Sequence, residues 1–544
     1  MPAFFNAADH LVDRHVRDGA GGRTAVVSGG RSLTYAELSG EVHRAAAGLR
    51  SIGVRPEERV LLCMADGVEL LAAILGAMHL GAVPVPVSTM VTGPELATML
   101  VDSRARVVGA SAVFADVVRA AVAAAPEVTD VVVHGEVRAS GAGADGSAGA
   151  AGSAGSDAGS AVRVHAWADV MQGPPLEQPY RTWADSPALW LYTSGTTGVP
   201  KAAMHRHGSV RAVCDTYGAL VLGIRPDDRC LSVPKLFFAY GLGNSAFFPL
   251  SVGAATVLEP ARPTPAGIAA TVTAERPTLF FAVPTFYSAL LAGDVADDTF
   301  ASVRVAVSAG EPLPAALLAR FRDRFGVEIV DGLGTTEALH IFLSNRPGAV
   351  VPGSSGVAVP GYRVELRDDL GAPVDGAGRP GHLFVAGPSL ATGYWCREDT
   401  NRQVFHGEWL RTGDTYVRND DGTLTSLGRS DDMLKAGGIW VSPTEVEARL
   451  LEHPGVAEAA VVAAPDADGL DKPVACVVAV AGRPVDPDAL IEFCRAGLAA
   501  YKRPRAVVPV AELPRTATGK IRRNVLRDLV RDELSGTVAD RVQP

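Results

Sequence analysis

Residues 192–201, YTSGTTGVPK, hold a set of groups that could bind a polyanion. The segment follows an apolar run, 187–191, that is predicted to form a buried strand. A short loop after such a strand presents backbone N–H groups, hydroxyl donors and one cation, which suit a nucleotide triphosphate. It is not a Walker loop, because the Gly-Lys-Ser/Thr sequence that opens the helix there is missing. Taken alone, it could equally be a surface hairpin loop. The residues concerned are Thr193, Ser194, Gly195, Thr196, Thr197, Gly198 and Lys201.

Further polar residues lie in turns or after apolar runs along the rest of the chain. Glu337 is a candidate Mg²⁺ ligand beside a phosphate-binding loop, since proteins usually hold Mg²⁺ through one or two carboxylates plus substrate phosphates. Asp414 could accept hydrogen bonds from two ribose hydroxyls, and Arg429 and Lys520 supply cations. Singly, these residues could be a helix-start acid, a turn residue and surface charges. Their fixed order over most of the chain argues for a shared site.

The elements that must position these residues follow a strand–helix rhythm. A helix is predicted within 33–54, a strand at 58–65 and a buried helix within 68–83, which indicates a parallel sheet with helices on its faces. The alternation resumes from 187 to about 340. There each strand ends in a small or polar cluster, which is where an α/β sheet places its ligand sites.

The C-terminal part of the chain changes character. Residues 350–430 are rich in Gly, Pro and short alternating strands, and predict a β-rich subdomain. Residues 431–544 predict a compact α+β segment that ends in a basic motif, PRTATGKIRR. Residues 138–161 are nearly all Ala, Gly, Ser and Asp, so we expect a disordered surface insertion, with a docking tether as the alternative.

Length and composition narrow the class of protein. The 544 residues are too many for one core, so two or more domains are expected. A net charge of −10 argues against the basic surface that nucleic-acid binding requires. No apolar stretch is long enough to span a membrane. The first residues lack the features of a secretory signal, so the cytoplasm is the expected location. The six cysteines have no close spacing, which excludes a CxxC metal or redox site.

As a set, these motifs resemble the adenylate-forming superfamily of acyl- and aryl-CoA synthetases, nonribosomal adenylation domains and firefly luciferase. The resemblance covers almost the whole chain apart from 138–161. Three segments, 235–244, 248–265 and 331–345, look like the benzoate-CoA ligase family specifically. The fold implied is α/β, with a large N-terminal domain of stacked α/β sheets plus a β-rich subdomain (1–430). A small mobile α+β domain (431–544) would rotate about a hinge at Asp431.

The resemblance also implies a role for each motif. The 192–201 loop would cover the β- and γ-phosphates of ATP. Glu337 would hold Mg²⁺, Thr336 would contact the α-phosphate, and Lys520 would be the catalytic lysine of adenylation. The pantetheine arm of coenzyme A would pass Lys435, Gly437 and Gly438. The remaining ATP- or AMP-binding residues would be Gly310, Glu311, Pro312, Asp331, Gly332, Thr335, Asp414 and Arg429.

The chemistry of the reaction agrees with these roles. A carboxylate that attacks the α-phosphate must overcome repulsion between two anions, and Lys520 would orient the attack and offset developing charge. Mg²⁺ would neutralise the leaving pyrophosphate. The aryl-adenylate is an anhydride that water would destroy, so a closing domain has a clear purpose. One domain that swings about Asp431 would let one site run both half-reactions.

The expected substrate is a flat aromatic acid. Aromatic and small residues could form an apolar slot for a planar ring. His340 could hydrogen-bond a ring substituent or the carboxylate, or it could be a core histidine. A long fatty acid is disfavoured by the crowding, and an amino acid by the lack of an acid in 236–243. The slot residues would be Phe238, Ala239, Tyr240, Ala309, Leu333, Gly334, His340 and Ile341.

These expectations combine into one leading function. The chain would use ATP, Mg²⁺ and coenzyme A to convert benzoate, or a small hydroxy- or aminobenzoate, into aryl-CoA through aryl-AMP. The alternative enzyme would load the aryl group onto the phosphopantetheine of an acyl carrier protein. A nucleotide-binding regulatory protein without catalysis is the alternative from another class. We expect no nucleic-acid or membrane partner, and a monomer or homodimer.

Overall fold

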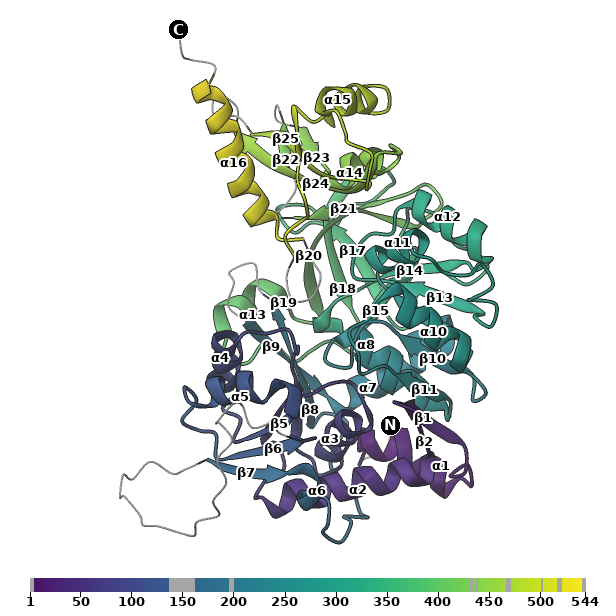
Figure 1. Cartoon of the computed structure of the whole chain (residues 1–544), viewed down its shortest axis with the longest axis vertical. Helices are drawn as coiled ribbons and strands as arrows, with labels where there is room; N and C mark the ends of the chain where they lie inside the picture. Colours follow the sequence, from purple (N-terminus) through teal and green to yellow (C-terminus); the bar gives the residue numbers. More distant parts are fainter. Residues whose placement is uncertain are drawn as a thin grey trace, which may run out of the picture. The chain divides into compact units, whose positions relative to one another are not determined.

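The computed structural model describes residues 4–136, 162–194, 200–430, 434–436, 439–465, 471–499, 502–515 and 521–540. Figure 1 shows the labelled helices and strands, coloured along the sequence. The chain forms two compact units whose segments interleave along the sequence. The first comprises 1–281, 336–340 and 388–401. The second comprises 282–335, 341–387 and 402–544. The predicted insertion at 138–161 and the predicted boundary at Asp431 lie outside the described residues, so both stay predictions.

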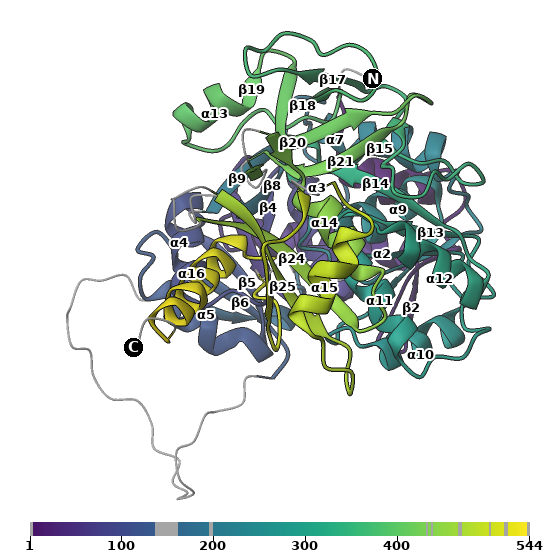
Figure 2. The same cartoon turned by 90° about the horizontal axis from the view of Figure 1, so that it is seen from above.

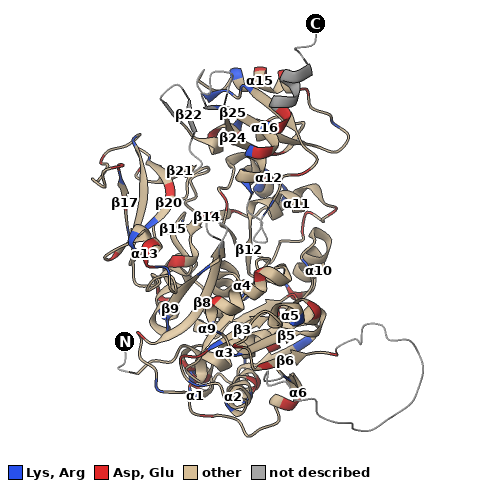
Figure 3. Ribbon diagram, turned by 90° about the vertical axis from the view of Figure 1, so that its left-hand side faces the viewer, with Lys and Arg blue, Asp and Glu red and all other residues tan. Residues whose placement is uncertain are grey.

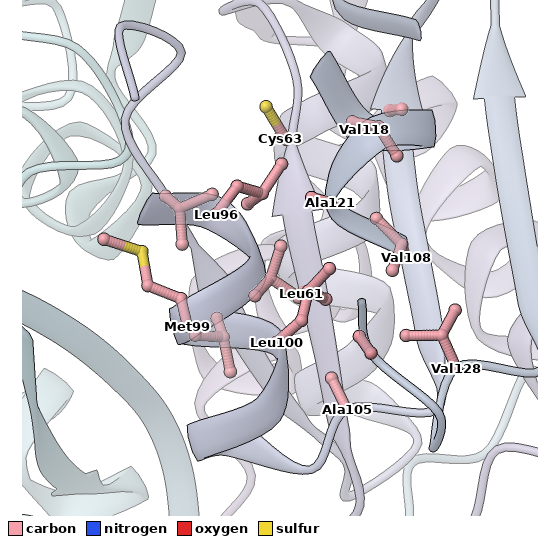
Figure 4. Close-up of a cluster of buried hydrophobic side chains, with 14 of the residues drawn as sticks. Leu61, Cys63, Leu96, Met99, Leu100, Ala105, Val108, Val118, Ala121 and Val128 are labelled. Carbon is pink, nitrogen blue, oxygen red and sulfur yellow. The ribbon is translucent and has the colours of Figure 1, made fainter. Parts of the chain in front are cut away.

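A five-stranded parallel sheet forms one layer of the first unit. Its strands run in the order β4 (Val83–Pro86), β3 (Arg59–Cys63), β5 (Val107–Ser111), β6 (Asp130–His134), β7 (Arg163–Ala166). Strand β5 is buried throughout, as expected where both faces of a parallel sheet are covered. Figure 4 shows Leu61 and Val108 of the sheet in one apolar cluster with Leu96 and Leu100 of α4 (Gly93–Ser103) and Val118 of α5 (Ala115–Val122).

Further strands of the first unit form a second layer. These are β2 (Arg31–Thr34), β1 (Thr24–Ser28), β11 (Ala255–Leu258), β10 (Arg229–Ser232) and β12 (Leu279–Ala282), in that order. The predicted helix in 33–54 is α2 (Tyr35–Ser51), which starts at a capping box between Thr34 and Glu37. It packs on α3 (Val68–His79) at Gly76, where a Cβ would lie 2.7 Å from the Cβ of Ala45. Further helices of this unit include α1 (Arg14–Arg17), α6 (Trp167–Val170), α7 (His207–Val213), α8 (Ala239–Leu242), α9 (Phe248–Val252) and α10 (Pro265–Glu275).

Two sets of strands carry the site residues of the second unit's N-terminal part. The first set is β13 (Val305–Ser308), β14 (Ile329–Gly334), β15 (Ile341–Ser344) and β16 (Val357–Ala358), near α11 (Pro284–Ala292) and α12 (Ala315–Phe325). The second set is antiparallel and contains β17 (Arg363–Arg367), β18 (Pro380–Ala386), β19 (Phe405–His406), β20 (Trp409–Arg418) and β21 (Leu424–Arg429). Residues 350–430 thus consist largely of strands, as expected, and the bounds of a subdomain there stay a prediction.

The C-terminal segment is a three-stranded sheet with helices on both faces. The strands are β24 (Val456–Pro465), β25 (Asp471–Ala479) and β26 (Ala506–Pro509), beside a short pair, β22 (Leu434–Ala436) and β23 (Ile439–Val441). Val461 packs with α14 (Pro443–Leu451) and α15 (Pro487–Arg495), whereas its neighbour Val462 packs with α16 (Arg523–Asp540). Figure 2 shows α14 and α15 on one side of β24 and β25 and α16 on the other. The alternation of Val461 and Val462 follows from the two-residue period of a strand. The predicted α+β character is confirmed.

Charge is dispersed over the described residues. Figure 3 shows Lys and Arg interspersed with Asp and Glu along both helices and strands. No helix among the described residues is both long enough and apolar enough to cross a bilayer.

The buried carboxylate of Asp130 joins β6 to β7 through its partners and supports a stability prediction. Asp130 is 1% exposed, and its carboxylate accepts hydrogen bonds from Arg163 (2.9 Å), His165 (2.7 Å) and Thr129 (2.7 Å). Burial alone would raise the pKa of Asp130, but these donors outweigh it and lower the pKa to about 2. The lowered pKa means that this stabilisation is complete above the unfolded pKa, near 4, and is lost as pH falls towards 2.

Asp130→Asn is therefore expected to lower the free energy of unfolding by about 1–3 kcal/mol at pH 7, because Arg163 loses its charged partner. The difference from the unmodified protein should shrink below pH 4. Urea unfolding at pH 7 and pH 3.5 measures it. Equal differences at both pH values would contradict the assignment.

Candidate active site

Several residues expected at the site lie outside the described ranges. They are Gly195, Thr196, Thr197, Gly198, Asp431, Gly437, Gly438 and Lys520. Ser194 and Lys435 are described for their backbone only. The other predicted site residues can be placed, each within its own unit.

The described parts of the predicted phosphate segment, 192–194 and 200–201, belong to two paired strands of the first unit. Strands β8 (Pro187–Ser194) and β9 (Pro200–Arg206) pair antiparallel, with Thr193 opposite Lys201. The strand thus runs three residues further than the apolar run 187–191 suggested. The ammonium group of Lys201 lies 5.0 Å from the ring centroid of Tyr394, within the range of a cation–π interaction.

Glu337 is held in a short 3-10 turn, η5 (Thr336–Ala338), in the same unit. Its side chain is buried, and its Oε1 accepts a hydrogen bond of 2.5 Å from the hydroxyl of Tyr394. The carbonyl oxygen of Thr336 accepts a 2.8 Å hydrogen bond from Nε2 of His205. Burial lowers the pKa of His205 to about 4, so this ring is neutral and serves as a fixed donor. The turn that presents Thr336 and Glu337 is therefore tightly held.

Tyr394 is the residue that sequence reasoning missed. Its ring contacts Lys201 and its hydroxyl binds Glu337, so it joins the phosphate segment to the candidate Mg²⁺ ligand. Two hydrogen bonds with Asn401 fix its backbone, from Tyr394 N to Oδ1 (2.7 Å) and from Nδ2 to Tyr394 O (2.9 Å). The only sequence signal was a tyrosine in the small-residue segment SLATGYW. Nothing in that segment indicates two partners so distant in the chain.

The predicted aryl-binding segment lies at the N-terminus of α8 in the first unit. Phe238, Ala239 and Tyr240 are half-buried, so part of each side chain is accessible. A Cβ at Gly241 would overlap the carbonyl oxygens of Pro234 and Lys235. Glycine is therefore required where the helix turns back over the preceding residues.

His340 packs against this segment. Its Nε2 lies 3.3 Å from the carbonyl oxygen of Tyr240 and 3.2 Å from Oδ1 of Asn244, so Nε2 must carry the proton if both are acceptors. Burial lowers the pKa of His340 to about 3, so the ring is neutral. Nδ1 then has a lone pair, and no described residue donates to it. The ring also lies 4.5 Å from that of Phe248. His340 is thus packed like a core histidine and keeps one acceptor.

In the second unit, the strand β14 places several predicted residues together. Gly332, Leu333 and Gly334 pair with β15, with Gly334 opposite Ile341. Asp331 is buried, and burial raises its pKa well above the usual range. No described residue hydrogen-bonds to its Oδ1.

The residues after β13 differ in exposure. Ala309 is buried, and Gly310, with φ +95°, adopts a left-handed conformation that favours glycine. Pro312 is exposed, and Glu311 lies 3.4 Å from Nη1 of Arg515. Thr335, after β14, is half-buried.

Asp414 and Arg429 are cross-strand partners in β20 and β21 of the second unit. Arg429 donates from Nη1 to Oδ1 of Asp414 (3.1 Å) and to the carbonyl oxygen of Thr412 (3.0 Å). The two residues, fifteen positions apart in the chain, therefore present a carboxylate and a guanidinium side by side.

Two family models of known proteins match this chain. Residues 12–395 match the AMP-binding enzyme family, and residues 445–520 match the AMP-binding enzyme C-terminal domain. The chain belongs to the AMP-binding enzyme family. The predicted superfamily and the predicted fold class, with a large N-terminal and a small C-terminal domain, are confirmed.

Named relatives match nearly the whole chain. A 4-hydroxybenzoate–CoA/benzoate–CoA ligase of Rhodopseudomonas palustris is 41% identical over 99% of this chain and 97% of its own length. A benzoate–CoA ligase of Thauera aromatica is 42% identical over 97% of this chain and 96% of its own. The solved structure of a benzoate CoA ligase from Burkholderia xenovorans LB400 is 40% identical, with a TM-score of 0.86, and the match covers 96% of this chain and 100% of that one.

Proposed function

We propose that this AMP-binding enzyme is an aryl-CoA ligase. It activates benzoate, or a small hydroxy- or aminobenzoate, with ATP to give aryl-AMP and pyrophosphate, and then transfers the aryl group to the thiol of coenzyme A. The observation that carries this proposal is the near-full-length likeness to two benzoate–CoA ligases. The half-buried aromatic segment at Phe238–Tyr240 supports it.

The cluster of Lys201, Tyr394 and Glu337 handles the phosphates. Glu337 offers a hard carboxylate oxygen, the ligand type that Mg²⁺ prefers, and Tyr394 fixes its orientation. Glu337 would hold Mg²⁺ in this way, and the ion would supply charge neutralisation for the leaving pyrophosphate. Thr193, Lys201 and the loop between them cover the outer phosphates, and Thr336 contacts the α-phosphate.

Residues of the second unit bind the nucleoside. The unpartnered Oδ1 of Asp331 accepts a hydrogen bond from the exocyclic amine of adenine, beside the backbone of 310–312. Asp414 accepts from the ribose hydroxyls, and Arg429 holds it in place. Both assignments give a role to a carboxylate that lies within a strand, Asp331 in β14 and Asp414 in β20.

Phe238, Ala239, Tyr240 and His340 of the first unit hold the aromatic ring of the acid. The proposed aryl-binding residues of the second unit are Ala309, Leu333, Gly334 and Ile341. Neutral His340 can only accept at Nδ1, so it favours a substituent that donates, such as hydroxyl or amino.

The small C-terminal domain supplies the remaining groups. Lys520 bridges the attacking carboxylate and the α-phosphate in the first half-reaction. Rotation about Asp431 then withdraws Lys520 and brings Lys435, Gly437 and Gly438 to the pantetheine arm of coenzyme A.

Pyrophosphate release against a panel of acids tests the proposal. We expect release with benzoate and with at least one hydroxy- or aminobenzoate, and none above background with alanine or dodecanoate. Pyrophosphate release with dodecanoate alone would overturn the assignment of an aryl substrate. Release with alanine alone would overturn it in the same way.

One prediction isolates the hydroxyl of Tyr394. Tyr394→Phe keeps the ring beside Lys201 but removes the donor to Glu337, so kcat/KM for ATP should fall about tenfold, the value of one hydrogen bond to a charged group. The Mg²⁺ concentration for half-maximal rate should rise. Pyrophosphate release over a Mg²⁺ series measures both quantities. An unchanged Mg²⁺ dependence would show that this hydroxyl does not position the metal ligand.

A further inference from the structure

We propose that Asp66 is a positioning residue for the aryl acid, acting through the backbone of the segment that holds the aromatic ring. The inference rests on the proposed function, because it concerns how that site is kept in shape. Asp66 is not near Phe238–Tyr240 in sequence, and no motif pointed to it.

The contact between Asp66 and the segment is direct. Asp66 follows β3, just before Gly67 at the N-terminus of α3, and is 6% exposed. The backbone N–H of Leu236, 170 positions away, donates to both of its oxygens, at 3.2 Å each. The carboxylate therefore fixes the residue that lies two positions before Phe238.

Lys235, the cation next to Leu236 in the chain, has hydrogen-bond partners of its own. Nζ of Lys235 donates to the carbonyl oxygens of Glu259 and Ala261, beyond the end of β11. Lys235 also attracts the carboxylate of Asp66 electrostatically. The start of the segment is thus held between the end of β3 on one side and the end of β11 on the other.

A rigid turn carries this anchoring to the aromatic residues. Phe238 N donates to the carbonyl oxygen of Lys235 (3.0 Å), and Leu242 N donates to that of Phe238 (2.8 Å). Gly241 packs close to the carbonyl oxygens of Pro234 and Lys235, which a Cβ at this position would overlap. Displacing Leu236 therefore displaces Phe238 and Tyr240.

A carboxylate is an unfavourable side chain at the buried position of Asp66. Burial opposes the charge strongly enough to raise the pKa of Asp66 to about 7, despite Lys235 and the Leu236 N–H. A buried charge of this kind costs stability unless its contacts are needed. Here the contacts are needed because the two oxygens of Asp66 hold one backbone amide of the aryl-binding segment.

The test compares how substitutions at Asp66 change KM for benzoate with how they change KM for ATP. Asp66→Asn keeps one oxygen for Leu236 N but loses the second acceptor and the charge. We expect KM for benzoate to rise about tenfold, with kcat and KM for ATP within twofold of the unmodified enzyme. Asp66→Ser, which is smaller and neutral, should give the same pattern and replaces the Asn variant if that one is insoluble. Asp116→Asn, an exposed carboxylate paired with Arg119, is the matched control and should change neither constant.

The outcomes separate the two proposals. An unmodified enzyme that releases pyrophosphate with benzoate, combined with an unchanged KM for benzoate in the Asp66 variants, overturns this inference alone. Equal rises in KM for benzoate and ATP would show a general structural role and would overturn it too. An unmodified enzyme without aryl-dependent pyrophosphate release overturns the proposed function, and this inference with it.

Discussion

Lys520→Ala is expected to slow aryl-adenylate formation roughly a thousandfold while leaving thioester formation from supplied aryl-AMP within about threefold of the unmodified rate. The physical reason is that two anions meet only in the first half-reaction, and Lys520 is the proposed cation between them. Single-turnover measurement of each half-reaction separates the two effects, with benzoate and ATP in one assay and benzoyl-AMP and coenzyme A in the other.

Lys472→Ala is the matched control, since Lys472 is another lysine of the C-terminal domain, in strand β25. It should leave both half-reactions close to the unmodified rates. Equal losses in both half-reactions for Lys520→Ala would mean that Lys520 maintains the structure rather than the chemistry.

Glu337→Gln is the second change with a large expected effect. The substitution keeps the size of the side chain and an oxygen that Tyr394 can bind, but it removes the charge that would hold Mg²⁺. We expect adenylation to fall by about 10²–10³-fold at 1 mM Mg²⁺ and to recover in part at higher Mg²⁺, because binding is weakened more than the reaction path is altered. Pyrophosphate release over a Mg²⁺ series reads out both effects.

Glu408→Gln provides the control for this experiment, since Glu408 is an exposed carboxylate paired with Arg363. It should not change the Mg²⁺ dependence. If Glu337→Gln lowered the rate equally at every Mg²⁺ concentration, Glu337 would not be the metal ligand.

Much of the fold could be predicted because its signals are local. The capping box at Thr34 and Glu37 marks the start of α2, and the run VELLAAILGAMH has the apolar character of a buried helix, α3. The clusters of small and polar residues around Asp331, in β14, and Glu337, in the turn after it, could be found for the same reason. Turn residues and hydrophobic periodicity can be recognised within a short stretch of consecutive residues.

Contacts between distant segments could not be predicted in the same way. Tyr394 reaches Glu337 across 57 positions, and Asp66 reaches Leu236 across 170. The sequence around Tyr394 and Asp66 contains no feature that indicates these contacts. Their roles arise from the tertiary fold, which brings strand ends and turns together, and one sequence without its structure does not record that juxtaposition.

The most direct test of the central claim is product analysis of one complete turnover with free coenzyme A. Benzoate, ATP and coenzyme A should yield benzoyl-CoA, AMP and pyrophosphate in equal amounts, measured by liquid chromatography and mass spectrometry. Omitting coenzyme A should leave benzoyl-AMP bound to the enzyme. Accumulation of benzoyl-AMP in the presence of coenzyme A, with no benzoyl-CoA, would contradict the assignment of an aryl-CoA ligase.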